Sequence, residues 1–126
     1  MRAVDTNVLV RLVTRDDAAQ VEKAEAFIEA GAWVSHVVLA ETTWVLEAAY
    51  DLEHAAIATA VRMLLSHESL TVQDGDVVRA ALETYSRRPS LGFSDCLVVE
   101  VARKAGHVPL GTFDRKLAKV PGTERL

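Results

Sequence analysis

The chain has 126 residues, half of them apolar and a quarter charged, and its formal net charge is −4. This length predicts a single domain over residues 1–126 with a core of its own. The only cysteine, Cys96, excludes an intrachain disulfide and indicates a reducing compartment, so we expect a cytoplasmic protein. No apolar run approaches the roughly 20 residues of a membrane span, and the acidic balance provides no general attraction to nucleic acid.

Short β-like segments alternate with longer segments of helical period, which is typical of an α/β fold around a mostly parallel sheet. Strands are predicted over residues 2–5, 32–35, 70–72 and 108–110, and the last is expected at the periphery because Pro109 cannot donate a ladder hydrogen bond. Helices are predicted from Thr6, after residues 16–17, over 36–50 and 53–65, and around the apolar positions of 77–85 and 97–105. Residues 87–92 are expected to form a loop within the domain.

Three aspartates are predicted at the ends of strands or at the start of a helix. Asp5 ends the first strand, Asp114 follows the last strand, and Asp95 opens a helix. Ligands of open α/β sheets bind beyond the carboxyl ends of the strands, so we expect these three carboxylates to converge. Helix capping explains each of them about equally well when it is taken alone.

A fourth acid, Glu41, interrupts an apolar helical face, because Val37, Val45 and Ala48 lie on the same side of the predicted helix. Burial of an unpaired carboxylate is costly, so this placement indicates a compensating cation or strong hydrogen-bond donors. The alternative is a boundary glutamate that reaches solvent or pairs with an arginine.

Converging carboxylates raise each other's proton affinity unless a cation enters. Oxygen ligands without nearby histidine or cysteine favour Mg²⁺ or Mn²⁺ over zinc. Such an ion orients a phosphate and neutralises the charge that develops during phosphodiester hydrolysis. The acidic residues therefore predict a hard divalent metal and the hydrolysis of nucleic acid.

The chain resembles the PIN-domain ribonucleases in an ordered set of short motifs that covers nearly its whole length. These motifs are Asp5-Thr6-Asn7, Glu41, Phe93-Ser94-Asp95 and Thr112-Phe113-Asp114. The resemblance implies a three-layer α/β/α fold and a metal-dependent endoribonuclease that leaves a 5′-phosphate and a 3′-hydroxyl. It implies Asp5 and Asp95 as the first metal ligands, with Glu41 and Asp114 completing the acidic cluster directly or through water. Supporting polar roles are implied for Thr6, Asn7, Ser94 and Thr112.

The compact length further resembles the VapC-like toxins of toxin–antitoxin pairs. That resemblance implies a homodimer and an antitoxin that covers the acidic pocket, and the apolar helix over residues 53–65 is either buried or an association surface. Lys116 stands where some relatives carry a further acid, and the hydrolysis we infer does not require a second ion held by the protein. Candidate contacts to the RNA backbone, each of which has a salt bridge or a solvated surface as its alternative, are Arg11, Arg15, Arg87, Arg88, Arg115 and Lys116.

Two other classes of protein compete with the nuclease. A phosphoacceptor signalling module also places acids at strand ends, but no acidic residue stands beside Asp5 and no suitable lysine follows the last strand. A PIN-like interaction protein without catalysis is the second alternative, and the presence of all four motif acids favours activity over it.

Overall fold

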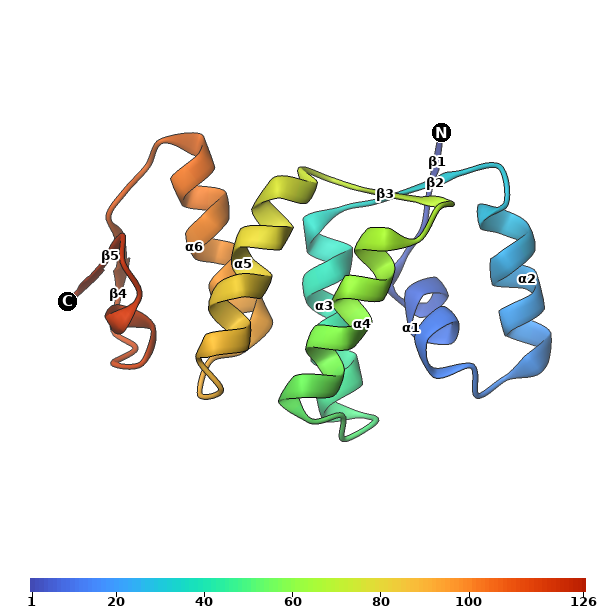
Figure 1. Ribbon diagram of the computed structural model, residues 1–126, viewed down its shortest axis with the longest axis horizontal. Coiled ribbons are helices and arrows are strands. Elements are labelled where there is room, and N and C mark those ends of the chain that lie inside the picture. The colour runs from blue at the N-terminus through green and yellow to red at the C-terminus, as the bar shows by residue number, and fades with distance from the viewer. The chain divides into compact units, whose positions relative to one another are not determined.

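The computed structural model describes residues 1–126 and contains six α-helices and five short strands (Figure 1). The helices are α1 (Thr6–Thr14), α2 (Ala18–Ile28), α3 (His36–Ala48), α4 (His54–Ser66), α5 (Gly75–Arg87) and α6 (Phe93–Ala105). The strands are β1 (Arg2–Ala3), β2 (Ala32–Val34), β3 (Leu70–Val72), β4 (Leu110–Thr112) and β5 (Thr123–Arg125), and a 3-10 turn, η1, spans Leu117–Lys119. The chain divides into two compact units, an N-terminal unit (Met1–Gly75) and a C-terminal unit (Asp76–Leu126). The single domain over residues 1–126 stays a prediction.

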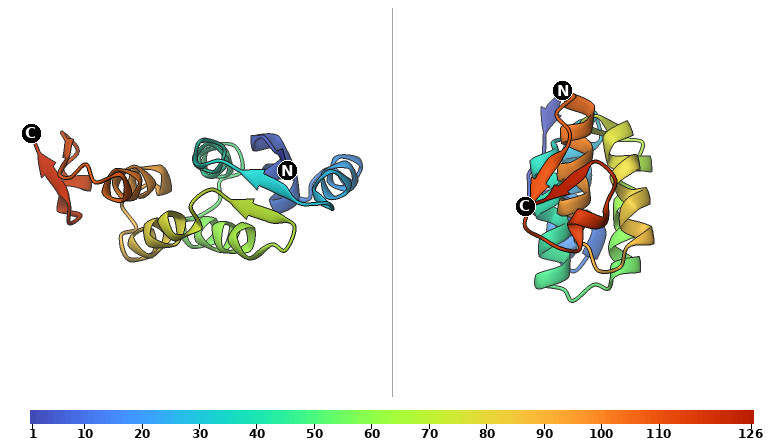
Figure 2. Two further views of the ribbon diagram at one scale, coloured as in Figure 1. Left: turned by 90° about the horizontal axis from the view of Figure 1, so that it is seen from above. Right: turned by 90° about the vertical axis from the view of Figure 1, so that its left-hand side faces the viewer.

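The N-terminal unit is built on a parallel sheet in the order β1-β2-β3. Arg2 pairs with Ala32, and Ala32 pairs with Leu70 on the other side of β2. Strands β2 and β3 run side by side in the left panel of Figure 2. Helix α1 packs against α2 and α3, and α4 packs against β3 and α3. The alternation of strands and helices predicted from the sequence is confirmed in this unit, with strand and helix ends shifted by at most two residues.

Polar residues start two of these helices. The Asp17 side chain accepts a hydrogen bond from the Gln20 N–H at 3.0 Å and caps α2. The Ser35 hydroxyl accepts from the Val38 N–H at 3.1 Å and caps α3, so the predicted strand over 32–35 ends one residue earlier. A side-chain acceptor at this position satisfies an N–H group that has no partner within the helix.

Helix α3 buries a different face from the one predicted. Its buried residues are Leu39, Thr42, Thr43 and Leu46, whereas Val37 is 75% exposed. The two threonines can be buried because their hydroxyls donate to carbonyl oxygens of the preceding turn, at 2.7 Å and 2.8 Å. The prediction of an apolar face around Glu41 was therefore wrong, because threonines that bond to their own helix pack as core residues.

In the C-terminal unit, α5 and α6 accompany a two-stranded parallel sheet, β4-β5. The predicted stripe of α5 is confirmed, since all of its members are buried: Val77, Val78, Ala81, Leu82 and Tyr85. The ring of Phe93 at the start of α6 meets Tyr85 edge to face, with centroids 5.7 Å apart. The predicted stripe of α6 is only partly correct, because Leu97 is buried but Val98 and Val101 are 50% and 40% exposed.

The last strands differ most from the prediction. The strand expected over 108–110 begins at Leu110, whose N–H donates to the Gly122 carbonyl at 2.9 Å. Pro109, which has no N–H, lies just before it. Strand β5 was not predicted, because it is three residues long and mostly polar. All strand pairs in both units are parallel, which confirms the α/β class with parallel pairing.

Candidate functional site

Asp5 lies directly after the first strand, where Val4 still donates a backbone hydrogen bond to Trp33 of β2 at 3.2 Å. It occupies the N-cap position of α1 in an extended conformation, but its side chain accepts no hydrogen bond from the helix. The capping explanation is therefore wrong for Asp5. Its exposed carboxylate is available to a ligand at the carboxyl end of the strand. Thr6 is buried and Asn7 is exposed in the first turn of the same helix.

Glu41 lies on the exposed side of α3. The alternative interpretation, a glutamate whose carboxylate reaches solvent, is what the structure contains. The inference that an apolar surrounding demands a cation at this residue was wrong, because the neighbours that suggested it are not core residues. A ligand role for Glu41 consequently has no support from burial and depends on the family motif.

Asp95 is half-buried in the first turn of α6. Its carboxylate folds back over the residue before the helix, so that a Cβ atom at Gly92 would lie 3.7 Å from the Asp95 Oδ2. Burial and the negative charge of Asp114 raise the pKa of the Asp95 carboxyl above its usual value, and a hydrogen bond from the Gly92 backbone opposes this shift. The ionised form of Asp95 is therefore disfavoured where it lies.

Asp114 follows β4 and caps the turn that leads into η1. Its Oδ1 accepts from the N–H groups of Lys116 at 2.8 Å and Leu117 at 3.2 Å. Its own N–H donates to the Thr112 hydroxyl at 3.0 Å. The capping explanation is thus confirmed for Asp114, although it does not exclude a second role. One carboxylate oxygen of Asp114 is hydrogen-bonded to the backbone. The negative charge of Asp114 nevertheless raises the pKa of Asp95.

Of the predicted site residues, Asp95 and Asp114 both belong to the C-terminal unit, and the charge of Asp114 raises the pKa of the Asp95 carboxyl. Asp5 and Glu41 belong to the N-terminal unit, and the convergence of all four acids stays a prediction. Neither unit by itself holds a group of three or more histidine, cysteine or acidic side chains that could bind a metal ion. A pair of carboxylates still fits Mg²⁺ or Mn²⁺, since Mg²⁺ in proteins keeps several waters and often uses one or two carboxylates. A cation also relieves the repulsion between Asp95 and Asp114.

Most of the arginines considered as RNA contacts have partners within the protein. Arg11 contacts Asp16 and Tyr50, Arg15 pairs with Glu25 at 3.5 Å, and Arg87 pairs with Glu83. For these three the salt-bridge alternative is confirmed. Exposed ion pairs of this kind contribute little to stability, so their main consequence is that these guanidinium groups already have an acidic neighbour.

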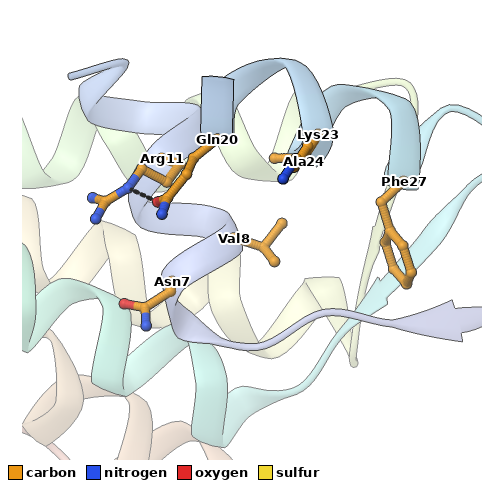
Figure 3. Close-up of a pocket in the computed structure, with 7 residues that line it drawn as sticks. All are labelled: Asn7, Val8, Arg11, Gln20, Lys23, Ala24 and Phe27. Carbon is orange, nitrogen blue, oxygen red and sulfur yellow. Dashed lines mark hydrogen bonds between the residues drawn. The ribbon is translucent and has the colours of Figure 1, made fainter. Parts of the chain in front are cut away.

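Sequence reasoning missed a pocket of about 400 Å³ between α1 and α2, which we call the α1–α2 pocket. It is lined by Asn7, Val8, Arg11, Gln20, Lys23, Ala24 and Phe27. Figure 3 shows side chains of the two helices around this space, with Arg11 hydrogen-bonded to Gln20. The sequence does contain a pattern that could have indicated the pocket. Asn7 and Arg11 are four residues apart in α1, and Gln20 and Lys23 are three apart in α2, so each pair lies on one face of its helix.

Both units have parallel strands, with Asp5 and Asp114 two residues beyond the ends of β1 and β4 and Asp95 in the first turn of α6, which is an α/β architecture with acids at strand ends. The family model of the PIN domain matches residues 2–123, and the chain belongs to the PIN-domain family. Its fold class is accordingly the three-layer α/β/α PIN fold predicted from the sequence. Comparison with the curated proteins and with the solved structures found no match. Proteins of this family have a nuclease-type fold and typically bind divalent metal ions.

No helix of this protein combines the length and apolar character needed to cross a bilayer.

Proposed function

We propose that this protein is a metal-dependent endoribonuclease that hydrolyses RNA phosphodiester bonds. The observation that carries the proposal is the Asp95–Asp114 pair, in which one carboxyl group has a raised pKa because it is partly buried beside another acid. The ionised form of Asp95 is unfavourable beside the charge of Asp114, and a bound cation would offset this cost. The family supports nuclease chemistry at such a site.

In this proposal Asp5 and Asp95 are the first ligands of Mg²⁺ or Mn²⁺, and Glu41 and Asp114 complete the cluster directly or through water. A divalent ion held by these carboxylates would supply orientation of the scissile phosphate, activation of water and neutralisation of developing negative charge. Asp114 is suited to its role because two backbone N–H groups fix the orientation of its carboxylate.

Four polar residues are proposed to support the acids: Thr6, Asn7, Ser94 and Thr112. For Thr112 this role is supported by its hydroxyl, which accepts a hydrogen bond from the Asp114 N–H. Ser94 is exposed next to Asp95, and Asn7 carries an exposed amide two residues after Asp5. These positions allow hydrogen bonds to ordered water or to the RNA.

We further propose that the protein is the toxin of a VapBC-type pair in the cytoplasm, active as a homodimer and inhibited by a cognate antitoxin. Apolar side chains left exposed on α3, Val37 at 75% and Trp44 at 66%, support an association surface. Helix α4, in contrast, buries most of its apolar residues, which include Ile57, Val61 and Leu64. Of the two alternatives for that helix, burial therefore holds for most of its apolar residues, but Met63 is 40% exposed.

The experiment that tests the activity is incubation of the purified protein with RNA and Mg²⁺ or Mn²⁺, followed by sequencing of the RNA ends. We expect internal cuts with 5′-phosphate ends, and none with Asp5→Ala or Asp95→Ala, which should both stay folded by circular dichroism. Full activity in either folded variant would contradict the assignment. Labelling by a phosphodonor without RNA cleavage would instead favour the phosphoacceptor module, and neither reaction would favour an inactive interaction protein.

A further inference from the structure

The α1–α2 pocket lies within the N-terminal unit and carries positive charge in a chain whose net charge is negative. Its two charged lining residues, Arg11 and Lys23, are both cations, and no acidic residue lines it. Its volume of about 400 Å³ falls in the range of small-molecule sites. Because Arg11 is paired with Asp16, Lys23 is the cation of this lining that suits an anionic ligand.

The two cations differ in their freedom. The Arg11 guanidinium is tied to Gln20, to Asp16 at 3.3 Å and to the Tyr50 hydroxyl at 3.0 Å, and Tyr50 in turn donates to Asp16. This network holds Arg11 as a rigid wall of the pocket. Lys23 forms no hydrogen bond or ion pair and its side chain is exposed. Its ammonium group is therefore the one available for an incoming anion.

The remaining wall of the pocket is largely apolar. Of the residues that line this wall, Val8 and Phe27 are half-buried and Ala24 is buried. The Arg2 guanidinium stacks over one face of the Phe27 ring, 3.8 Å from its centre, and donates a hydrogen bond to the Phe27 backbone carbonyl at 2.9 Å. The stacking restrains the ring, so little side-chain freedom is lost when a ligand contacts its edge or its other face.

A hydrogen-bonding group completes the pocket. The Asn7 amide, which can both donate and accept, has no partner within the protein, and it is exposed at the end of the pocket formed by the first turn of α1. Asn7 follows Asp5 by two residues, so their Cα atoms are at most about 7.6 Å apart. The pocket thus begins beside one of the proposed metal ligands.

We propose that the α1–α2 pocket binds one nucleotide of a single-stranded RNA substrate, next to the bond that is cut. The base lies against Val8 and Phe27, the Asn7 amide bonds to its polar edge or to the sugar, and Lys23 contacts the phosphate. This inference rests on the proposed ribonuclease function and names a substrate subsite for it. An RNA nucleotide is favoured over an acidic peptide because it supplies a flat apolar face, a hydrogen-bonding edge and a negative charge in one unit.

The test measures binding of a labelled twelve-nucleotide single-stranded RNA to the full chain in EDTA, where metal-dependent cleavage is absent. We expect Lys23→Ala to weaken binding several-fold and to reduce the slope of log affinity against log salt by about 0.7, the effect of one lost phosphate contact. Lys119→Ala is the matched control, since Lys119 is also an exposed lysine and lies in η1 outside the pocket. It should leave both quantities unchanged.

Two further ligands separate the parts of the proposal. An abasic oligomer of the same length should bind at least five-fold more weakly than the RNA, because it lacks the base that contacts the apolar wall. Hexaglutamate should not compete with the RNA at equal concentration. Binding of the abasic oligomer as tight as that of RNA, or displacement of the RNA by hexaglutamate, would overturn the assignment of a nucleotide.

Failure of this inference is distinguishable from failure of the proposed function. If the wild-type protein cleaves RNA with Mg²⁺ and Lys23→Ala binds the RNA with an unchanged salt slope, only the subsite is wrong. If the wild-type protein neither binds nor cleaves RNA, the ribonuclease proposal fails and the subsite with it.

Discussion

At the scale of single residues, the four acids of the motif do different things in the folded chain. Asp5 is exposed and caps nothing, Glu41 faces solvent, Asp95 is half-buried, and Asp114 caps a turn while it repels Asp95. Three aspartates and one glutamate thus have four different surroundings. Asp95 has a position that costs stability when it is ionised, which makes its role the easiest to test.

We expect Asp95→Asn to stabilise the protein at pH 7 in EDTA. The pKa of Asp95 is raised by burial and by Asp114, so the folded state binds the proton more tightly than the unfolded state. The stabilising contribution is complete below the usual carboxyl pKa of about 3.9 and is lost as pH rises through the raised value. Urea denaturation between pH 4 and pH 8 should show a gain for Asp95→Asn at pH 7 that disappears towards pH 4.

Asp76→Asn is the matched control for this measurement. The hydrogen bond from Lys104 lowers the pKa of Asp76, so its contribution is present above the usual carboxyl pKa and is lost as pH falls. Asp76→Asn should therefore destabilise the protein slightly at pH 7, the opposite sign to Asp95→Asn. A loss of stability at pH 7 in both variants would contradict the electrostatic account of Asp95.

Asp114 allows its structural and functional roles to be separated. Asn retains an oxygen that accepts the two backbone N–H groups but removes the charge, whereas Ala removes both. We expect Asp114→Ala to cost about 0.5–2 kcal/mol, as for the loss of a helix cap, and Asp114→Asn to cost a few tenths at most. Both should lose most RNA cleavage, as measured on a labelled RNA with Mg²⁺. An active Asp114→Asn variant would mean that the residue is only a cap.

At the scale of elements, the position of a helix in the chain was easier to predict than its orientation about its own axis. Helix α3 was predicted over nearly the right residues but with the wrong face inwards. Thr42 and Thr43, two polar residues by composition, satisfy their hydroxyls within the helix and join the core. The apolar periodicity was therefore counted on residues that lie outside the core.

The orientation of α3 predicts which of its apolar residues contribute to the free energy of unfolding. Leu39 is fully buried, and Leu39→Ala should reduce the free energy of unfolding by roughly 2–5 kcal/mol. Val37 lies two residues earlier in the same helix and is 75% exposed, so Val37→Ala should change it by less than about 0.5 kcal/mol. Chemical denaturation of the two variants measures both. Equal costs would show that Val37 is also covered in solution.

At the scale of the whole molecule, the acids of the motif are distributed over two compact units, Met1–Gly75 and Asp76–Leu126. Asp5 and Glu41 come from the first unit, and Asp95 and Asp114 come from the second. Under the proposed function, a cation that binds acids of both units also links the stability of the whole chain to metal concentration.

We accordingly expect Mg²⁺ or Mn²⁺ to raise the melting temperature of the wild-type protein, and EDTA to reverse the rise and to abolish RNA cleavage. At a metal concentration of 100 times the dissociation constant, the gain in stability is about 2.7 kcal/mol. Thermal denaturation with increasing metal measures it. Asp95→Asn should show a much smaller rise, and an identical rise in the variant would exclude Asp95 as a ligand.

The order of the helices and of the first four strands, the parallel class and the family were determined by the sequence alone, because hydrophobic periodicity, breaker residues and the order of Asp5, Asp95 and Asp114 are all local patterns. The tertiary structure decided which side of α3 is buried, that Asp114 caps a turn while Asp5 does not, and that α1 and α2 enclose a basic pocket. These features depend on contacts between segments distant in the chain and on hydrogen bonds that a linear pattern does not specify. The burial of a side chain, the repulsion between Asp95 and Asp114 and the absence of a partner for Lys23 all depend on which residues surround a group, and folding alone brings those neighbours together.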